Sequence, residues 1–174
     1  MSEKNLTKVR LRAMEPEDLD FLYNIENDRE LWNVGNTNVP YSRYVLHDYI
    51  ANATNDIYSD GQVRMIVENA DGRTVGMADL FDFNASHRRA ELSIVIMRGF
   101  RRCGYAEASV RYMLHYAQRI LHLNQVYAVI SVDNKPSIAL FDKCGFTTSA
   151  NLPEWLFDGE KYTGLTHLAF VCVK

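Results

Sequence analysis

The sequence predicts a mixed α/β (α+β) fold. We expect one domain over residues 1–174, with a central, twisted, mostly antiparallel sheet and helices on both faces. Three observations predict it. Runs rich in β-branched residues alternate along the chain with segments whose apolar residues follow helical spacing. With 174 residues, 47% of them hydrophobic, the chain suits one domain with a substantial core. No internal repeat, linker or low-complexity tract divides the chain.

The chain opens with a strand and two helices. Val9–Arg12 alternates apolar and basic residues, as a half-buried strand does. Glu15–Asp18 then places acidic residues and an early proline where a helix begins. Asn33–Pro40 is polar and rich in turn-forming residues, so a loop is expected there. Tyr44–Ala53 follows as a second helical segment.

A hairpin and a strand–turn–helix unit form the middle of the chain. Strands at 63–68 and 74–83 flank Asn69–Gly72, whose Asp-Gly pair suits a tight hairpin turn. The apolar, β-branched run around 91–96 predicts a mostly buried strand. Apolar residues then recur at helical spacing between 106 and 121, which predicts a helix with one buried face.

The last third adds a strand, a short helix and more strands. Val126–Val132 is β-branched and predicts another strand. Asp133–Pro136 begins a short helix, and Gly145 ends it. Strands are then expected at 146–149 and 165–173, with a second hairpin turn between them over 157–162.

The turn Arg101–Ala106, between the strand at 91–96 and the next helix, is the first candidate site. The start of a helix presents unpaired backbone N–H groups and the positive end of the helix dipole, so such a turn can hold phosphate. The sequence lacks the Gly-Lys-Ser/Thr ending of a Walker loop and the three spaced glycines of a dinucleotide fingerprint. A tight strand–helix connection with solvated arginines is the competing interpretation.

Composition argues against several other classes of protein. The net charge of −3 and the pI of about 5.9 disfavour a general nucleic-acid binder. No apolar run approaches the length of a membrane span, and the start of the chain has no signal-peptide core. The three cysteines are far apart, so we expect neither a disulfide framework nor a metal site. A cytoplasmic location is the simplest expectation.

Several motifs, taken in order, resemble the GNAT acetyltransferase superfamily. Arg101–Ala106 is similar to its Gln/Arg-x-x-Gly-x-Gly/Ala pyrophosphate loop. Asn134 and the segment Phe141–Phe146 are similar to its Asn-x-x-Ala/Ser…Tyr-x-x-x-Gly-Phe element. Phe157-x-Gly159-x-x-Tyr162 resembles the closing hairpin of the branch with ribosomal-protein N-terminal (alanine) acetyltransferases and spermidine N-acetyltransferases, and His87–Glu91 resembles the spermidine enzymes.

The resemblance implies acetyl-CoA as the acetyl-donor co-substrate. Backbone groups of three strand residues would pair with its pantetheine arm, and the turn would bind its pyrophosphate. The residues implied to bind acetyl-CoA are Ile94, Val95, Ile96, Arg101, Arg102, Cys103, Gly104, Tyr105, Ala106, Glu107, Asn134, Ser137, Phe141 and Lys143. The side chain of Asn134 would bond the arm, although an asparagine there could equally cap the helix that follows.

The resemblance also implies the catalytic positions. Glu91 would accept the proton of the amine, directly or through water, or orient a cationic acceptor. A surface pairing of Glu91 with Arg88 or Arg89 is the alternative. At Phe141 the family commonly has a tyrosine that protonates the departing CoA sulfur, and phenylalanine cannot do so. Tyr127 is one conceivable substitute, although a tyrosine in a half-buried strand is usually structural.

The predicted function is therefore direct acetyl transfer from acetyl-CoA to a primary amine, on a polyamine such as spermidine, a peptide N-terminus or another small amine. The missing tyrosine hydroxyl leaves an alternative, a non-catalytic acyl-CoA-binding regulatory module. The acceptor stays open, because the stretch 36–43 has no acid and one arginine, and the acids near it are Glu26, Asp28, Glu30 and Asp48. A homo-oligomer is compatible with the resemblance, and neither nucleic acid nor membrane is an expected partner.

Overall fold

A computed structural model describes residues 7–32, 39–54, 56–157 and 159–172. Seven strands in this part of the chain form one sheet in the order β1-β2-β3-β4-β5-β7-β6. Their bounds are β1 Val9–Ala13, β2 Val63–Asn69, β3 Thr74–Asn84, β4 Arg89–Ile96, β5 Gln125–Ser131, β6 Thr147–Phe157 and β7 Tyr162–Val171. All neighbours are antiparallel except β4 and β5, which confirms the mostly antiparallel mixed sheet.

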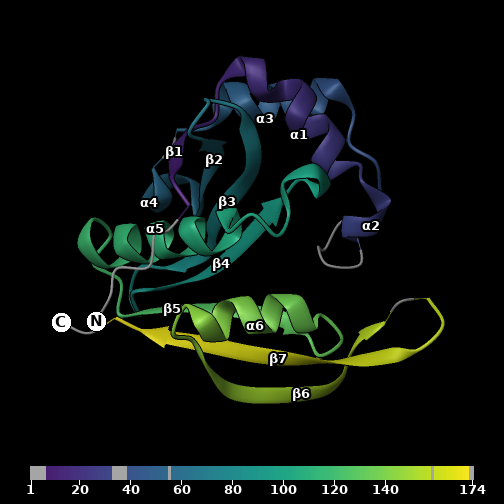
Figure 1. The fold of residues 1–174 in the computed structure, drawn as a ribbon, viewed down its shortest axis with the longest axis vertical. Helices are drawn as coiled ribbons and strands as arrows, with labels where there is room; N and C mark the ends of the chain where they lie inside the picture. Colours follow the sequence, from purple (N-terminus) through teal and green to yellow (C-terminus); the bar gives the residue numbers. More distant parts are fainter. Residues whose placement is uncertain (1–6, 33–38, 55, 158, 173–174) are drawn as a thin grey trace.

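The helices lie on both faces of the sheet, as the sequence predicts. Their bounds are α1 Leu19–Glu26, α2 Arg29–Trp32, α3 Arg43–Asn52, α4 Ile57–Asp60, α5 Tyr105–Arg119 and α6 Lys135–Lys143, with 3₁₀ turns at Pro16–Asp18 and Arg98–Phe100. Figure 1 shows α1 and α3 at one end of the molecule, with α5 and α6 packed along the sheet. The predicted loop 33–38 lies outside the described residues.

Two apolar clusters sandwich the sheet. On one face, the fully buried Val110 and Met113 of α5 belong to the same cluster as Leu80 of β3. On the other face, Leu22 of α1 packs with Ile66 of β2. Alternate strand residues point to opposite faces, so neighbouring residues of β4 join different clusters. Residue 91 and its neighbours at alternate positions consequently face the side covered by α1 and α3.

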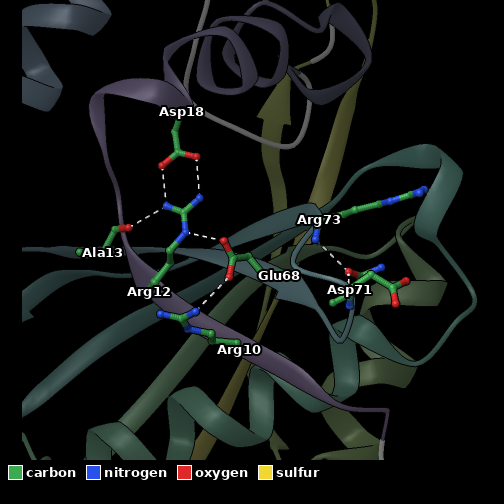
Figure 2. Close-up of polar contacts among 8 residues, drawn as sticks. Arg10, Arg12, Ala13, Asp18, Glu68, Asp71 and Arg73 are labelled. Atoms are coloured by element: carbon green, nitrogen blue, oxygen red, sulfur yellow. Dashed lines mark hydrogen bonds and ion pairs between the residues drawn. The ribbon is translucent and has the colours of Figure 1, made fainter.

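Arg12 fixes the start of α1 onto the edge strand β1. Figure 2 shows its guanidinium between two carboxylates. Nη1 and Nη2 donate to Asp18 at 2.6 and 2.9 Å, and Nε donates to Glu68 at 2.6 Å. Bidentate arginine–carboxylate pairs are strong and directional, so this contact holds the start of α1 against β1 and β2.

Four elements differ from the expectations. α5 ends at Arg119, and Ile120 lies 62% exposed beyond it. β6 continues well past residue 149, as far as Phe157, through a register shift between Leu152 and Leu156. The short α2 and α4 were not expected from the sequence, because neither is long enough to show helical periodicity.

Candidate active site

Among the helices α3, α4, α5 and α6 of the described chain, α5 alone has a glycine at its N-cap. Ser42, Asp56 and Asn134 cap α3, α4 and α6 through their side chains. The N-cap of α5 is Gly104, with φ of 83°, and it has no side chain to offer the first turn. The first N–H groups of a helix have no partner within it, so an anion can accept from them at this end.

The turn before α5 is held by contacts at both sides. The Arg101 Nε donates to the carbonyl oxygen of Ile96 at 3.0 Å, which ties the turn to the end of β4. The Thr7 hydroxyl donates to the carbonyl oxygen of Cys103 at 2.8 Å. Arg102 and Cys103 are exposed. The structure therefore brings the predicted residues 101–106 together as a fixed, accessible and positively charged turn.

Glu107 and Lys143 were both predicted to contact acetyl-CoA, and the structure places them in contact with each other. Lys143 Nζ forms an ion pair with the Glu107 carboxylate, and Arg111 Nη2 donates a hydrogen bond to the same carboxylate at 3.1 Å. These hydrogen bonds, that from Lys143 foremost, lower the pKa of Glu107 below its ordinary value. Arg111 Nη2 also donates to the Lys143 carbonyl oxygen at 2.9 Å, so the network joins α6 to the first turns of α5.

The strands β4 and β5 separate on one side of the predicted site. Their parallel pairing runs from Arg89 opposite Gln125 to Glu91 opposite Tyr127 and stops there in the described structure. Beyond this point β4 continues to Ile96, paired with β3 alone. Backbone groups on the β5 side of residues 92–96 consequently have no strand partner in the described structure, and unpaired backbone groups need hydrogen-bond partners. An extended, amide-containing ligand would supply them. We call this gap in the strand pairing the β4–β5 opening.

Asn134 lies where β5 ends and α6 begins. Its Oδ1 accepts a hydrogen bond from the Ser137 backbone N–H at 3.2 Å, so the capping role considered for it is present. This cap uses the side-chain oxygen and leaves the amide NH₂ group to other partners. Asn134 and Ser137 can thus stabilise the first turn of α6 and still line the candidate site.

Phe141 belongs to the core. Its side chain is 2% exposed and packs edge-on against Phe146, with ring centroids 4.8 Å apart. The ring is therefore held by packing on the α5–α6 face of the sheet.

Glu91 is half-buried at the last paired position of β4 and β5, next to the opening. Burial raises the pKa of its carboxyl to about 7, and the nearby Asp82 carboxylate adds to the rise, whereas a hydrogen bond from the Val129 backbone opposes it. A carboxyl with a pKa near neutrality can both accept and release a proton at working pH, as a general base must. The perturbed pKa marks Glu91 as a functional candidate on physical grounds.

Asp82 is a neighbour of Glu91 that the sequence analysis missed. Its carboxylate accepts a hydrogen bond from the hydroxyl of Tyr127. Tyr127 is buried and stacks on His167, with ring centroids 5.1 Å apart. Because Tyr127 already donates its proton to Asp82, the structure gives it a partner other than a departing thiolate. No sequence motif signals this contact, because Asp82 and Tyr127 lie 45 residues apart.

Comparison with known proteins decides the family. Residues 8–147 match the model of the acetyltransferase (GNAT) domain. The chain belongs to the GNAT acetyltransferase family. It is an N-acetyltransferase, and its acetyl donor is acetyl-CoA.

Relatives of this GNAT enzyme act on a polyamine. This chain is 29% identical to the spermidine N(1)-acetyltransferase of Vibrio cholerae serotype O1 over 156 residues, which cover 90% of this chain and 88% of the relative. The spermidine N(1)-acetyltransferase of Escherichia coli K12 is 27% identical and covers 88% of this chain, with 81% of its own length matched. A crystal structure of the V. cholerae enzyme with CoA and spermine superposes with a TM-score of 0.82 at 28% identity, covering 94% and 95% of the chains.

Two of the acids that lie near the stretch 36–43 in the sequence have partners within this GNAT enzyme. Glu26 Oε1 accepts from Arg64 Nη1 at 2.7 Å, and Asp79 accepts from the same arginine at 2.8 Å. Asp48 accepts from Asn52 at 2.9 Å. The side chain of Glu30 and residues 36–38 lie outside the described structure. No described helix is long and apolar enough to cross a membrane.

Proposed function

We propose that the enzyme transfers the acetyl group of acetyl-CoA to a primary amine of a linear polyamine such as spermidine. The half-buried Glu91, whose pKa is raised to about 7 beside the β4–β5 opening, is the observation that carries the proposal. The activity of the V. cholerae and E. coli relatives on spermidine supports the class of acceptor. A dodecameric relative supports assembly of this chain into a homo-oligomer.

Acetyl-CoA fits the residues that line the two features described above. The uncapped first turn of α5, with Gly104 at its start, would hold the pyrophosphate. The backbone of Ile94–Ile96 would pair with the pantetheine arm in the opening, and the amide of Asn134 would bond the same arm. When bound, acetyl-CoA supplies a thioester whose acyl carbon is open to attack by an amine, with loss of the CoA thiol.

The chain supplies the proton transfer. The attacking nitrogen must lose a proton as its bond to the acyl carbon forms, and Glu91 would accept that proton directly or through one water. A backbone N–H of β4 would stabilise the negative charge that develops on the acyl oxygen. Phe141 cannot protonate the sulfur. A thiol with an ordinary pKa of about 8.5 can leave as its thiolate and take a proton from solvent.

A panel of amines tests the acceptor. We expect release of free CoA with spermidine and spermine, because a second ammonium group adds attraction to the carboxylate of Glu91. Peptides whose only cation is the N-terminus should give a kcat/KM lower by about tenfold or more, the effect of losing roughly one such contact. Aminoglycosides carry several ammonium groups on rings, so they test whether the acceptor must be linear. The measurement is thiol release at fixed acetyl-CoA across the panel.

Equal rates for peptides and polyamines would contradict the polyamine proposal while keeping acetyl transfer. Tight acetyl-CoA binding without CoA release for any amine would instead favour the alternative of a non-catalytic binding module.

Substitutions at Asn134 separate helix capping from cofactor binding. Asn134→Asp keeps the oxygen that caps α6 and removes the NH₂ donor, so we expect an unchanged free energy of unfolding and a higher KM for acetyl-CoA. Asn134→Ala removes both, and loss of the cap should also lower the free energy of unfolding by about 1 kcal/mol. Urea unfolding and initial rates measure the two effects. An unaltered KM in both variants would leave Asn134 as a cap alone.

A further inference from the structure

The hydrogen bond between Tyr127 and Asp82 crosses the strand that carries Glu91. Tyr127 lies on β5 and Asp82 on β3, and β4 lies between these two strands in the sheet. Glu91 of β4 pairs with Tyr127 on one side and with Phe81, the residue before Asp82, on the other. The contact, which we name the Asp82–Tyr127 bridge, therefore passes over β4 at Glu91.

Both ends of the bridge are fixed by the fold. Asp82 adopts a left-handed backbone conformation with φ of 48°, where the pairing of β3 and β4 shifts register between Phe81 and Asn84. Non-glycine residues rarely adopt this conformation, and it recurs where a structure needs a side chain in one particular place. The Tyr127 ring is held at the other end by its stack on His167.

We propose that Asp82 and Tyr127 are positioning residues for acetyl transfer, because the bridge between them holds Glu91 at the opening and the buried Tyr127 keeps water from its carboxyl on that side. The inference rests on the proposed function, in which Glu91 accepts the amine proton. Neither residue needs to touch the acceptor to act in this way.

The groups around Glu91 agree with this role. Asp82 faces it from β3 and Tyr127 from β5; His167 of β7 and Arg89 of β4 act on Tyr127. Burial is the largest cause of the raised pKa of Glu91, and the charge of Asp82 adds to it. Burial and the hydrogen bond to Asp82 raise the pKa of Tyr127, so its hydroxyl stays a neutral donor at working pH. Further along the same face, Arg64 pairs with Asp79 and Glu26.

Two isosteric substitutions separate the charge from the bridge. Asp82→Asn keeps an oxygen that can accept from Tyr127 and removes the charge beside Glu91. We expect the acidic limb of the kcat/KM profile to move down by about half a pH unit, with kcat above pH 8 nearly unchanged. Tyr127→Phe breaks the bridge and admits water, so the limb should move down by about one unit and kcat should fall severalfold. The KM for acetyl-CoA should not change in either.

A second measurement needs no acceptor. The raised pKa of Glu91 makes the folded protein lose stability as pH rises from about 4.5 to about 7. In each variant, the free energy of unfolding should differ less between pH 5 and pH 8 than it does in the wild-type protein. Tyr58→Phe, at an exposed tyrosine, and Asp71→Asn, in an exposed turn, are the matched controls and should behave as wild type.

Profiles that coincide with those of the controls would overturn the inference. So would a loss of activity without movement of the acidic limb, because that is the result of a merely structural contact. The proposed function fails separately, if wild-type enzyme releases no CoA with any amine; the unfolding measurement then still reports whether the bridge raises the pKa of Glu91.

Discussion

Gly104→Asp is expected to reduce acetyl-CoA affinity by about a hundredfold or more. The substitution places a negative charge at the start of α5, where the N–H groups of the first turn would donate hydrogen bonds to the pyrophosphate. Repulsion of about 3 kcal/mol suffices for a hundredfold loss. Isothermal titration with acetyl-CoA measures it.

Gly104→Ala is the control, because the structure predicts a cost unrelated to charge. A Cβ at this position would lie 2.5 Å from the Thr7 hydroxyl, and a φ of 83° is strained for any side chain. Alanine and aspartate share this cost, so the affinity difference between the two variants isolates the charge. Equal affinities in both variants, with native circular dichroism, would remove this turn from the acetyl-CoA site.

Glu91→Gln is expected to lower amine turnover by on the order of tenfold to a thousandfold, because a positioned general base is lost. The change keeps the shape of the side chain, so acetyl-CoA affinity should hold. In wild-type enzyme, the rate should rise with pH through about 7 as Glu91 loses its proton. The variant should lose this limb and retain only the dependence that comes from deprotonation of the amine itself.

The same substitution should stabilise the protein at alkaline pH. Glu91 has a pKa of about 7 in the folded chain and about 4.5 in the unfolded chain, so the folded state binds more protons between these values. Its contribution to stability therefore falls as pH rises through this window, and glutamine removes the penalty. We expect Glu91→Gln to have a higher free energy of unfolding than wild type at pH 8 and an equal one at pH 4.

The exposed Glu17→Gln serves as the control for both effects. Lower stability of Glu91→Gln at pH 8 would show that Glu91 serves the fold rather than the reaction. If acetyl-CoA affinity falls and turnover at saturating cofactor does not, Glu91 acts on the cofactor side.

Local patterns were enough to predict the unit from β4 to α5, since a buried strand, a glycine turn and an amphipathic helix each leave a signature in consecutive residues. β6 left a weak one. It is an edge strand whose residues are mostly exposed, and it contains Pro153, which is tolerated at an edge or a bulge but argues against a strand in sequence. α4 has a capping Asp56 and a terminal Gly61, but only four residues lie between them.

In the candidate site, too, local patterns predict some features, whereas others depend on the tertiary fold. Glu91 and the turn before α5 lie within one short stretch, so their motif could place them. Asp82 and Tyr127 meet because of the order of strands in the sheet, which no local pattern encodes. The pairing of Glu107 with Lys143 likewise depends on how α5 packs against α6. Sequence reasoning therefore proposed residues for the candidate site, and it missed Asp82 and the contacts that the structure shows between distant residues.

The opening between β4 and β5 would make the stability of the enzyme depend on its donor supply. Residues 92–96 of β4 have no strand neighbour on the β5 side, so acetyl-CoA bound there as proposed would complete the hydrogen bonding of the sheet centre. A ligand that binds only the folded state at a hundred times its Kd adds about 2.7 kcal/mol to stability. Melting temperature should accordingly climb with acetyl-CoA concentration, and the lifetime of the protein against proteolysis would follow the abundance of activated acetyl groups around it.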